Sequence, residues 1–333
     1  MNKLRIIFFG TDEFSAPIFR ELLQMDLESL IDLVAVVTKP NSSSHGRTIE
    51  PEIARIANEF NHEFSRKIAV FQSIKLTEIN DKLASLKPDA GVLVSFGKII
   101  PQSTLDIFAK KYLAETRSTL GAGIINFHPS LLPKLRGPSP IETAILNGDQ
   151  ETGLTLMRLV REMDAGPILY QEKISLNGRE NAPELREKFA QRGAKIFREK
   201  LLELLQNHPE TKPQDESEAT FSQIINKSDA ILDTAAMTAD EADRRVRAFK
   251  QWPKARLNFA KTSARFFAKF PDQNIIITEA SALAMAPGDG WPDVISFAPE
   301  RPGETPTALK ISRIISPKSG RYISMDEFLR GLK

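Results

Sequence analysis

Apolar residues in the N-terminal part of the chain fall into two alternating patterns. Short, nearly continuous apolar runs predict buried strands at 4–9, 33–38, 68–71, 90–95, 123–128, 153–159 and 167–174. Apolar residues recur at helical spacing at 14–23, 74–86, 139–146 and 182–206. Apolar strands that alternate with helices are typical of an α/β fold whose sheet is covered on both faces. The pattern therefore predicts a Rossmann-like, doubly wound and mostly parallel sheet.

Polar positions divide the rest of the chain. Residues 208–219 are polar and contain Pro209 and Pro213, which predicts a linker between a first domain at 1–207 and a second at 220–333. Within the second, 239–249 has helical spacing. Strand-like pieces lie between Gly and Pro turns at 255–259, 274–279, 293–297 and 308–315. Strands of this length favour a small β-barrel.

Polar chemistry is concentrated at the end of the strand predicted at 123–128. Strand side chains alternate between faces, so Asn126 and His128 share one face while Phe127 points to the other. Open α/β sheets place their ligand crevice at such strand ends. An amide and an imidazole there, together with the carboxylate of Asp164, suit the stabilisation of an oxyanion in acyl transfer to an amine. The alternative is a buried, hydrogen-bonded histidine beside a capping asparagine.

Gly10 ends the first predicted strand without a dinucleotide fingerprint. The residues that follow, Thr11, Asp12 and Glu13, do not continue the G-x-G-x-x-G spacing. An acidic pair at this turn would also repel a pyrophosphate. We therefore expect a Rossmann-like sheet that holds no dinucleotide.

Composition excludes several kinds of chemistry. The 333 residues include no cysteine, which rules out disulfides, thiolate zinc sites and cysteine nucleophiles. The four histidines are scattered without metal-ligand spacing, so we expect no protein-held metal. No apolar run approaches the roughly 18 residues that span a bilayer. Because a strand is predicted from residue 4, no signal peptide is expected either, and we predict a cytoplasmic protein.

Positive charge is concentrated in the second half of the chain. Residues 220–333 carry 17 basic and 13 acidic side chains, and 244–269 contains nine basic residues and no acidic one. Aromatic residues such as Phe249 and Trp252 are interleaved with them. This pattern is the electrostatic footprint of a protein that neutralises phosphates. The alternative is a solvated face. In the first domain, 41–48 is predicted as a polar loop, either a plain surface loop or one that offers Arg47 to a nucleic acid.

Several motifs resemble one family of enzymes. They are the strings NFHPSLLPKLRG at 126–137, PI at 140–141, NGD at 147–149, ETG at 151–153 and DAG at 164–166. These resemble enzymes that take a formyl group from 10-formyltetrahydrofolate. PQDES at 213–217, RAF at 247–249, WP at 252–253 and DEFLRG at 326–331 resemble the methionyl-tRNA formyltransferases within that superfamily. The resemblance covers essentially the whole chain.

The resemblance implies roles for particular residues. Asn126, His128 and Asp164 would be catalytic. The residues expected to bind the folate donor are Ser130, Leu131, Leu132, Pro133, Phe96, Gly97 and Ile99. The second domain is expected to be similar to an OB-fold and to bind tRNA. We assign tRNA contacts to Arg244, Arg247, Lys250, Lys254 and Lys261 of that domain and to Arg47 of the first. No metal, membrane or obligate protein partner is implied.

The implied reaction is direct formyl transfer to the α-amine of methionine esterified to initiator tRNA, giving formylmethionyl-tRNA for translation initiation. His128 and Asn126 would donate hydrogen bonds to the oxyanion, and Asp164 would orient His128 and help move the proton to the folate nitrogen. Three alternatives remain. The first is a sugar-nucleotide formyltransferase, which would not need the basic segment 244–269. The second is a formyltetrahydrofolate hydrolase, which would release formate without an acceptor. The third is a non-catalytic RNA-binding protein.

The chain departs from the family pattern at four places, none of them in the catalytic trio. Arg47 is followed by Thr48, Ile49 and Glu50 where the family usually has two lysines that grip the acceptor stem. Asp12 replaces the usual proline, Lys250-Gln251 precede the Trp-Pro pair, and 161–163 (REM) lead into Asp164. We therefore expect the chemistry to be retained, and the grip on tRNA to be weaker at Arg47 or shifted elsewhere.

Overall fold

The computed structural model describes residues 3–44, 46–108, 123–206, 211–258, 274–283, 294–297, 307–317 and 319–330. The chain divides into two compact units. The first consists of Met1–Pro138, Thr152–Ile174 and Arg186–Ser222. The second consists of Ser139–Glu151, Ser175–Leu185 and Gln223–Lys333.

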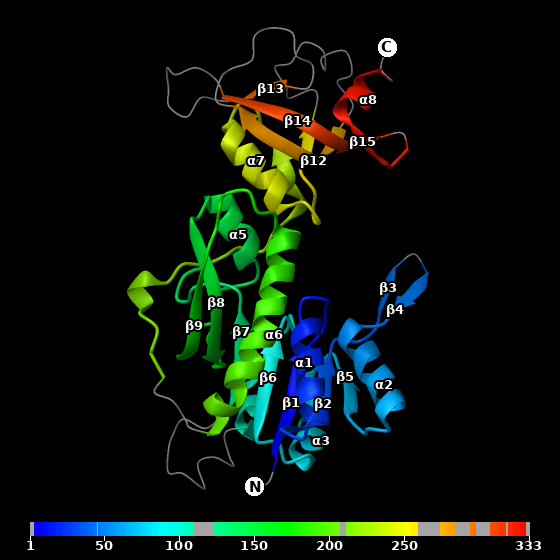
Figure 1. Ribbon diagram of the computed structural model, residues 1–333, viewed down its shortest axis with the longest axis vertical. Helices are drawn as coiled ribbons and strands as arrows, with labels where there is room; N and C mark the ends of the chain where they lie inside the picture. The colour runs from blue at the N-terminus through cyan, green and yellow to red at the C-terminus, as the bar shows by residue number, and fades with distance from the viewer. Residues whose placement is uncertain are drawn as a thin grey trace. The chain divides into compact units, whose positions relative to one another are not determined.

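A seven-stranded sheet with the order β5-β2-β1-β6-β7-β8-β9 organises the first unit (Figure 1). Its strands are β1 (Leu4–Gly10), β2 (Ile31–Thr38), β5 (Ala69–Gln72), β6 (Ala90–Val94), β7 (Ile124–His128), β8 (Glu151–Arg158) and β9 (Ile168–Ser175). The pairs from β5 to β7 are parallel, and β8 joins β7 antiparallel. The predicted α/β, Rossmann-like fold is confirmed, with a sheet that is mixed.

The central strands are largely apolar because helices cover both faces of the sheet, whereas the edge strand β9 is mostly half-buried or exposed. Phe8 of β1 stacks on Phe19 of α1, with ring centroids 4.9 Å apart. Its neighbours Ile7 and Phe9 point the other way, into a core with Leu83 of α3. The helices of the first unit are α1 (Ala16–Leu27), α2 (Glu52–Phe64), η1 (Leu76–Ile79), α3 (Asn80–Ser85), most of α6 (Ala182–Gln206) and the short η2 (Glu216–Glu218). Helix α5 (Pro140–Asn147) belongs to the second unit.

The structure differs from the sequence-based expectation at three places in the first unit. The helix predicted over 74–86 is a 3-10 turn, η1, followed by the short α3. The segment predicted as a polar loop, 41–48, instead contains a small antiparallel hairpin, β3 (Ser42–Ser44) and β4 (Arg47–Ile49). Helix α2 was not predicted, although Ile53, Ile56 and Phe60 are buried at the spacing of an amphipathic helix.

The second unit contains a six-stranded sheet with the order β10-β11-β12-β14-β13, and β15 pairs with β14. Its strands are β10 (Ile231–Leu232), β11 (Arg256–Asn258), β12 (Asn274–Leu283), β13 (Val294–Phe297), β14 (Thr307–Ile315) and β15 (Tyr322–Ser324). Its other helices are η3 (Lys227–Ala230), α7 (Ala239–Ala248) and α8 (Met325–Arg330). Thr238 and Glu241 form a capping box at the start of α7.

Phe127 fixes the orientation of β7. Its ring packs on Phe14 and on Phe197 of α6, at centroid distances of 5.9 and 6.2 Å. Gly193 of α6 lies directly over this ring, and a Cβ at that position would come within 2.8 Å of both Phe127 Cζ and Ile18 Cδ1. Because Phe127 is anchored on this side, Asn126 and His128 point to the opposite face.

In the described part of the chain, no helix is long and apolar enough to cross a membrane.

Replacing Gly193 by alanine tests this packing. Helix propensity alone would stabilise the chain by about 1 kcal/mol. Crowding against Phe127 and Ile18 costs about 1–3 kcal/mol, so we expect Gly193→Ala to lower the midpoint of urea unfolding. The exposed Gln191→Ala on the same helix is the control and should change stability by less than about 0.5 kcal/mol. A Gly193→Ala protein that is more stable than wild type would contradict the close approach.

Candidate active site

Asn126 and His128 lie on β7 between a parallel and an antiparallel neighbour. Asn126 is opposite Leu93 of β6 and Met157 of β8, and His128 is opposite Thr155. Each has only 5% of its surface exposed. Both side chains are polar groups in the interior, where the cost of burial requires hydrogen-bond partners.

Asp164 supplies a carboxylate to both of them. Its Oδ2 lies 3.7 Å from His128 Nδ1, and its Oδ1 lies 3.5 Å from Asn126 Nδ2. The backbone N–H of Gly137 donates to Oδ2 at 2.8 Å, which anchors the carboxylate. The structure therefore brings together the three side chains that the sequence singled out.

The partner of His128 Nε2 determines which ring nitrogen faces Asp164. Nε2 lies 3.0 Å from the carbonyl oxygen of Leu135. Because a carbonyl only accepts, we assign the hydrogen to Nε2 from this partner. Nδ1 is then the nitrogen that is directed at Asp164 and can exchange a proton with a substrate.

Asp164 itself has an uncommon backbone conformation. Its φ is 50°, in the left-handed region, which asparagine and aspartate tolerate better than most residues. Two positions later, a Cβ on Gly166 would collide with the carbonyl oxygen of Arg158. The D-A-G sequence thus combines a residue that accepts the turn with a glycine that permits close contact between main chains.

The predicted folate segment 130–133 follows β7 and is held through its main chain. Thr155 Oγ1 donates to Ser130 O at 2.7 Å, and Gln171 Nε2 donates to Leu132 O at 2.9 Å. The side chains of Ser130 and Leu132 are buried, with 1% and 2% exposed. Leu131 and Pro133 are half-buried. Contacts from this segment to a ligand would therefore come from main-chain groups and from Leu131 and Pro133.

The other predicted folate residues lie at the end of β6, the neighbour of β7. Phe96 is fully buried in the core beside Phe9. Gly97 has a φ of +66°, which turns the chain at this point. Ile99 is 86% exposed, so among these three residues it is the one with apolar side-chain surface to offer.

Sequence reasoning missed two residues that support the site, Arg136 and Gln214. Gln214 Nε2 donates to the carbonyl oxygens of Asp164 and Gly166 at 2.8 and 2.7 Å. The buried Arg136 donates to Gln214 Oε1 and, through two nitrogens, to Glu216. These hydrogen bonds lower the pKa of Glu216 below its usual value. The PQDES string was the available signal, but it indicated only a family resemblance.

The predicted tRNA contacts have different surroundings. Arg47 is exposed on β4. Arg244 donates to Leu146 O at the end of α5, and Arg247 pairs with Asp243 and donates to Glu180 O, all within the second unit. Lys254 Nζ lies 5.9 Å from the ring centroid of the exposed Tyr322. Lys250 is half-buried, and Lys261 lies outside the described residues.

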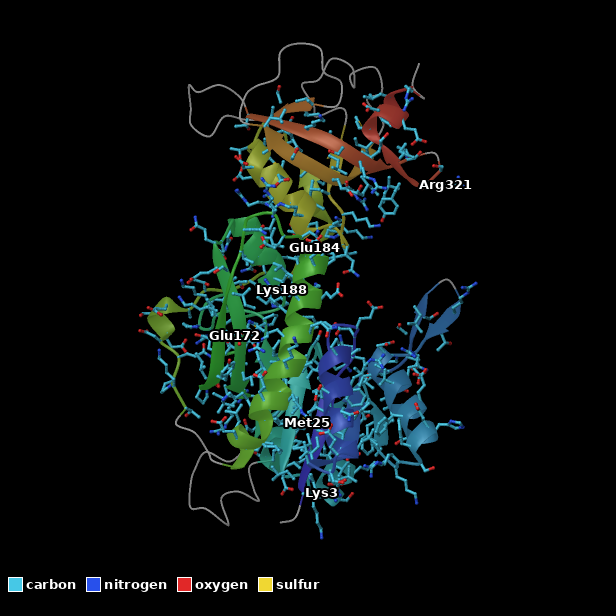
Figure 2. All side chains as sticks on the ribbon, in the orientation of Figure 1. Lys3, Met25, Glu172, Glu184, Lys188 and Arg321 are labelled. Carbon is cyan, nitrogen blue, oxygen red and sulfur yellow. The ribbon has the colours of Figure 1, made fainter. Side chains whose placement is uncertain are left out.

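A polar cluster on β9, the edge strand beyond β8, is separate from the predicted site. Glu172 of β9, labelled in Figure 2, accepts from Tyr170 and from two nitrogens of Arg192 of α6. The hydrogen bond from Arg192 is the main cause that lowers the pKa of Glu172, and burial raises the pKa of Tyr170. Among the described residues, no group of three or more His, Cys, Asp or Glu side chains could hold a metal ion.

Comparisons with known proteins show which family this chain belongs to. Residues 4–201 match the family described as formyl transferase. A methionyl-tRNA formyltransferase of Bacillus mycoides is 30% identical, over 99% of this chain and 96% of that protein. An N-formyltransferase from Helicobacter canadensis, solved with folinic acid and dTDP-3-aminofucose, is 18% identical with a TM-score of 0.62, over 93% of this chain and 99% of that one. HypX from Aquifex aeolicus, solved with tetrahydrofolic acid, is 13% identical with a TM-score of 0.59 over 98% of this chain, which spans 47% of HypX.

The match over 4–201 and the fold make this chain a member of the formyl transferase family. Within that family, the match over nearly the full length of the Bacillus protein places it with the methionyl-tRNA formyltransferases. The resemblance drawn from the sequence motifs is thereby confirmed.

Replacing Gly166 by alanine tests the turn that carries Asp164. The added Cβ would overlap the carbonyl oxygen of Arg158, and a main-chain atom cannot move away as a side-chain end can. We expect a loss of about 1–3 kcal/mol in the free energy of urea unfolding. The comparison variant is Gly178→Ala, where the Cβ has open space but φ is +78°, so its loss measures backbone strain without crowding. A loss below about 0.5 kcal/mol in Gly166→Ala would contradict the close contact with Arg158.

Proposed function

We propose that this chain transfers the formyl group of 10-formyltetrahydrofolate to the α-amine of methionyl initiator tRNA. The product is the formylmethionyl-tRNA that begins translation in the cytoplasm. The observation that carries the proposal is the convergence of Asn126, His128 and Asp164 at the end of β7. It occurs in a chain whose near-full-length relatives are named methionyl-tRNA formyltransferases.

The proposed roles of the three residues follow from their partners. The bound donor would supply the formyl carbon that the amine attacks, with negative charge developing on the formyl oxygen. Asn126 Nδ2 and a proton on His128 Nδ1 are the donors that this chain offers to that oxygen. Asp164, anchored by Gly137, stabilises positive charge on the His128 ring. It also takes part, directly or through water, in moving the amine proton to the folate nitrogen that leaves.

The residues around the site fit a flat heterocycle with polar edges. Such ligands need apolar walls together with a few fixed polar groups. Ile99 offers an exposed apolar side chain, and Leu131 and Pro133 offer part of theirs. The segment 130–133 offers main-chain groups whose positions are fixed by Thr155 and Gln171. We assign the folate donor to these residues, together with Phe96 and Gly97 as the turn that presents Ile99.

Recognition of tRNA is assigned mainly to residues 220–333, which we propose form an OB-fold-like domain joined to 1–207 by the linker 208–219. Short strands paired largely antiparallel support this assignment. The nine basic residues of 244–269 support a role in neutralising phosphates. Among the tRNA contacts predicted from the sequence in this segment, Lys250 and Lys254 are the best described candidates, because Arg244 and Arg247 already bond to carbonyl oxygens of the protein. Arg47 is the candidate in the first domain.

Three other functions remain for the test to separate, one of them a formyltetrahydrofolate hydrolase, which would release formate without an acceptor. A sugar-nucleotide formyltransferase would share the site, and the fold is similar to that of the Helicobacter canadensis enzyme. An RNA-binding protein without catalysis would not need a carboxylate held between an amide and an imidazole. The near-full-length relatives favour methionyl-tRNA as the acceptor.

The first experiment measures the loss of the formyl group from 10-formyltetrahydrofolate under three conditions: with charged initiator tRNA, with a sugar nucleotide that has a free amine, and without any acceptor. We expect transfer to the charged tRNA alone. Asp164→Asn should keep the fold, since asparagine tolerates the same φ. It should lower kcat about a hundredfold or more, since the charge that supports His128 is lost.

Asp81→Asn is the matched control, because Asp81 is an exposed carboxylate in the first turn of α3, an element that carries none of the three residues. It should retain wild-type kcat. Transfer to the amino sugar would favour the first alternative, formate release without an acceptor would indicate a hydrolase, and no reaction at all would refute the proposed function.

Salt dependence tests the assignment of tRNA binding. Each phosphate contact contributes roughly 0.7–0.9 to the slope of log K against log salt, because counterions are released. The double variant Lys250→Glu/Lys254→Glu should therefore weaken binding of charged tRNA and flatten that slope. Lys195→Glu/Lys227→Glu, at two exposed lysines outside 244–269, is the charge-matched control and should have little effect. Unchanged affinity and slope in the double variant would mean that these lysines form a solvated face.

A further inference from the structure

The segment 212–222, called here the brace, overlaps the predicted linker 208–219 and the start of the predicted second domain, yet it makes specific contacts within the first unit. We propose that Gln214 of the brace and Arg136 are positioning residues that set the placement of Asp164 and His128 for the reaction. This inference rests on the proposed function and names two residues that the reaction depends on indirectly.

Gln214 uses its whole amide group. Its two N–H hydrogens have acceptors in the carbonyl oxygens of Asp164 and Gly166, at 2.8 and 2.7 Å. Its carbonyl oxygen accepts from Arg136 Nε and Nη2, at 3.1 and 2.8 Å. The two carbonyls flank the turn in which Asp164 has its left-handed φ. An amide is the side-chain group that can donate twice on one side and accept on the other.

Arg136 connects this turn to the groups that hold the catalytic side chains. Its side chain is 3% exposed and forms a two-pronged ion pair with Glu216, as well as the bonds to Gln214. Its neighbours in sequence are Leu135, whose carbonyl holds His128 Nε2, and Gly137, whose amide holds Asp164 Oδ2. A shift of Arg136 would therefore move a partner of His128 and a partner of Asp164 together.

Main-chain bonds fix the same stretch from the other side. Arg136 N donates to Thr220 O, and Ser222 N donates to Arg136 O. Leu135 N donates to Thr220 Oγ1 at 2.9 Å. A Cβ on Gly137 would come within 2.8 Å of Ser222 O, which shows how closely these two main-chain segments approach each other. The brace thus determines where residues 135–137 present their carbonyl and amide.

The substitutions follow from these bonds. Gln214→Met keeps the length of the side chain and removes both donors. Gln214→Glu keeps acceptors for Arg136 but directs a negative oxygen at the carbonyls of Asp164 and Gly166. We expect kcat to fall about ten- to a hundredfold in both, since a displacement near 1 Å can cost that much, while the KM values for donor and tRNA change little. Gln223→Met is the matched control at an exposed glutamine and should retain wild-type kcat.

A double-mutant cycle separates positioning from a general loss of structure. If Gln214 acts through Asp164, then Gln214→Met should cause no further loss of kcat in an Asp164→Asn background. A purely structural role would lower kcat by the same factor in both backgrounds, and that result would overturn the proposal. Arg136→Lys, which keeps the charge but not the fork of donors, should lie between wild type and Gln214→Met.

The Gly137 amide gives a readout that does not depend on activity. The chemical shift of this amide proton depends on its hydrogen bond to Asp164. We expect the shift to change in Gln214→Met and to stay the same in Gln223→Met. If wild-type protein formylates no acceptor, the proposed function fails while this measurement still decides the positioning role. An unchanged Gly137 resonance in Gln214→Met, in a protein with wild-type unfolding behaviour, would refute the proposal.

Discussion

The hydrogen bond from the Gly137 amide to Asp164 Oδ2 is the interaction on which the site depends. At 2.8 Å it fixes one carboxylate oxygen, and the other oxygen then lies 3.5 Å from Asn126 Nδ2. The same oxygen that Gly137 holds lies 3.7 Å from His128 Nδ1. A carboxylate held by a backbone amide costs little reorganisation when charge develops nearby, which is the condition under which such groups contribute most to catalysis. The sheet positions Asn126 and His128, and loops position the Asp164 carboxylate and the Gly137 amide.

Much of the fold and the candidate catalytic trio was predictable from the sequence. Strands covered on both faces appear as continuous apolar runs, so β1, β2 and β7 were placed within a few residues of their positions. The alternation of side chains put Asn126 and His128 on one face, and the structure shows Phe127 packed on the other. The short β3–β4 hairpin was not predicted, because a polar, serine-rich stretch carries no apolar alternation from which to recognise strands.

The brace could not be predicted because its contacts join residues far apart in sequence. Gln214 lies 78 positions from Arg136 and 50 from Asp164, and nothing in the local pattern of a polar, proline-containing segment indicates such partners. The polar composition that made 208–219 resemble a linker is also what allows Gln214 and Glu216 to satisfy a buried guanidinium. Charge patterning carried a similar ambiguity: Arg244 and Arg247 belong to the basic segment, yet both donate to carbonyl oxygens of the protein itself.

The most direct test of the account is whether Asn126, His128 and Asp164 act as one unit in formyl transfer to methionyl initiator tRNA. Single-turnover rates would be measured for Asn126→Ala, His128→Ala, Asp164→Asn and the triple variant, at saturating donor and charged tRNA. Catalytic residues that act together show strongly non-additive losses, so the account predicts a triple variant within about tenfold of the slowest single variant. Losses that multiply across the three substitutions would contradict it, because they would show that the residues contribute independently.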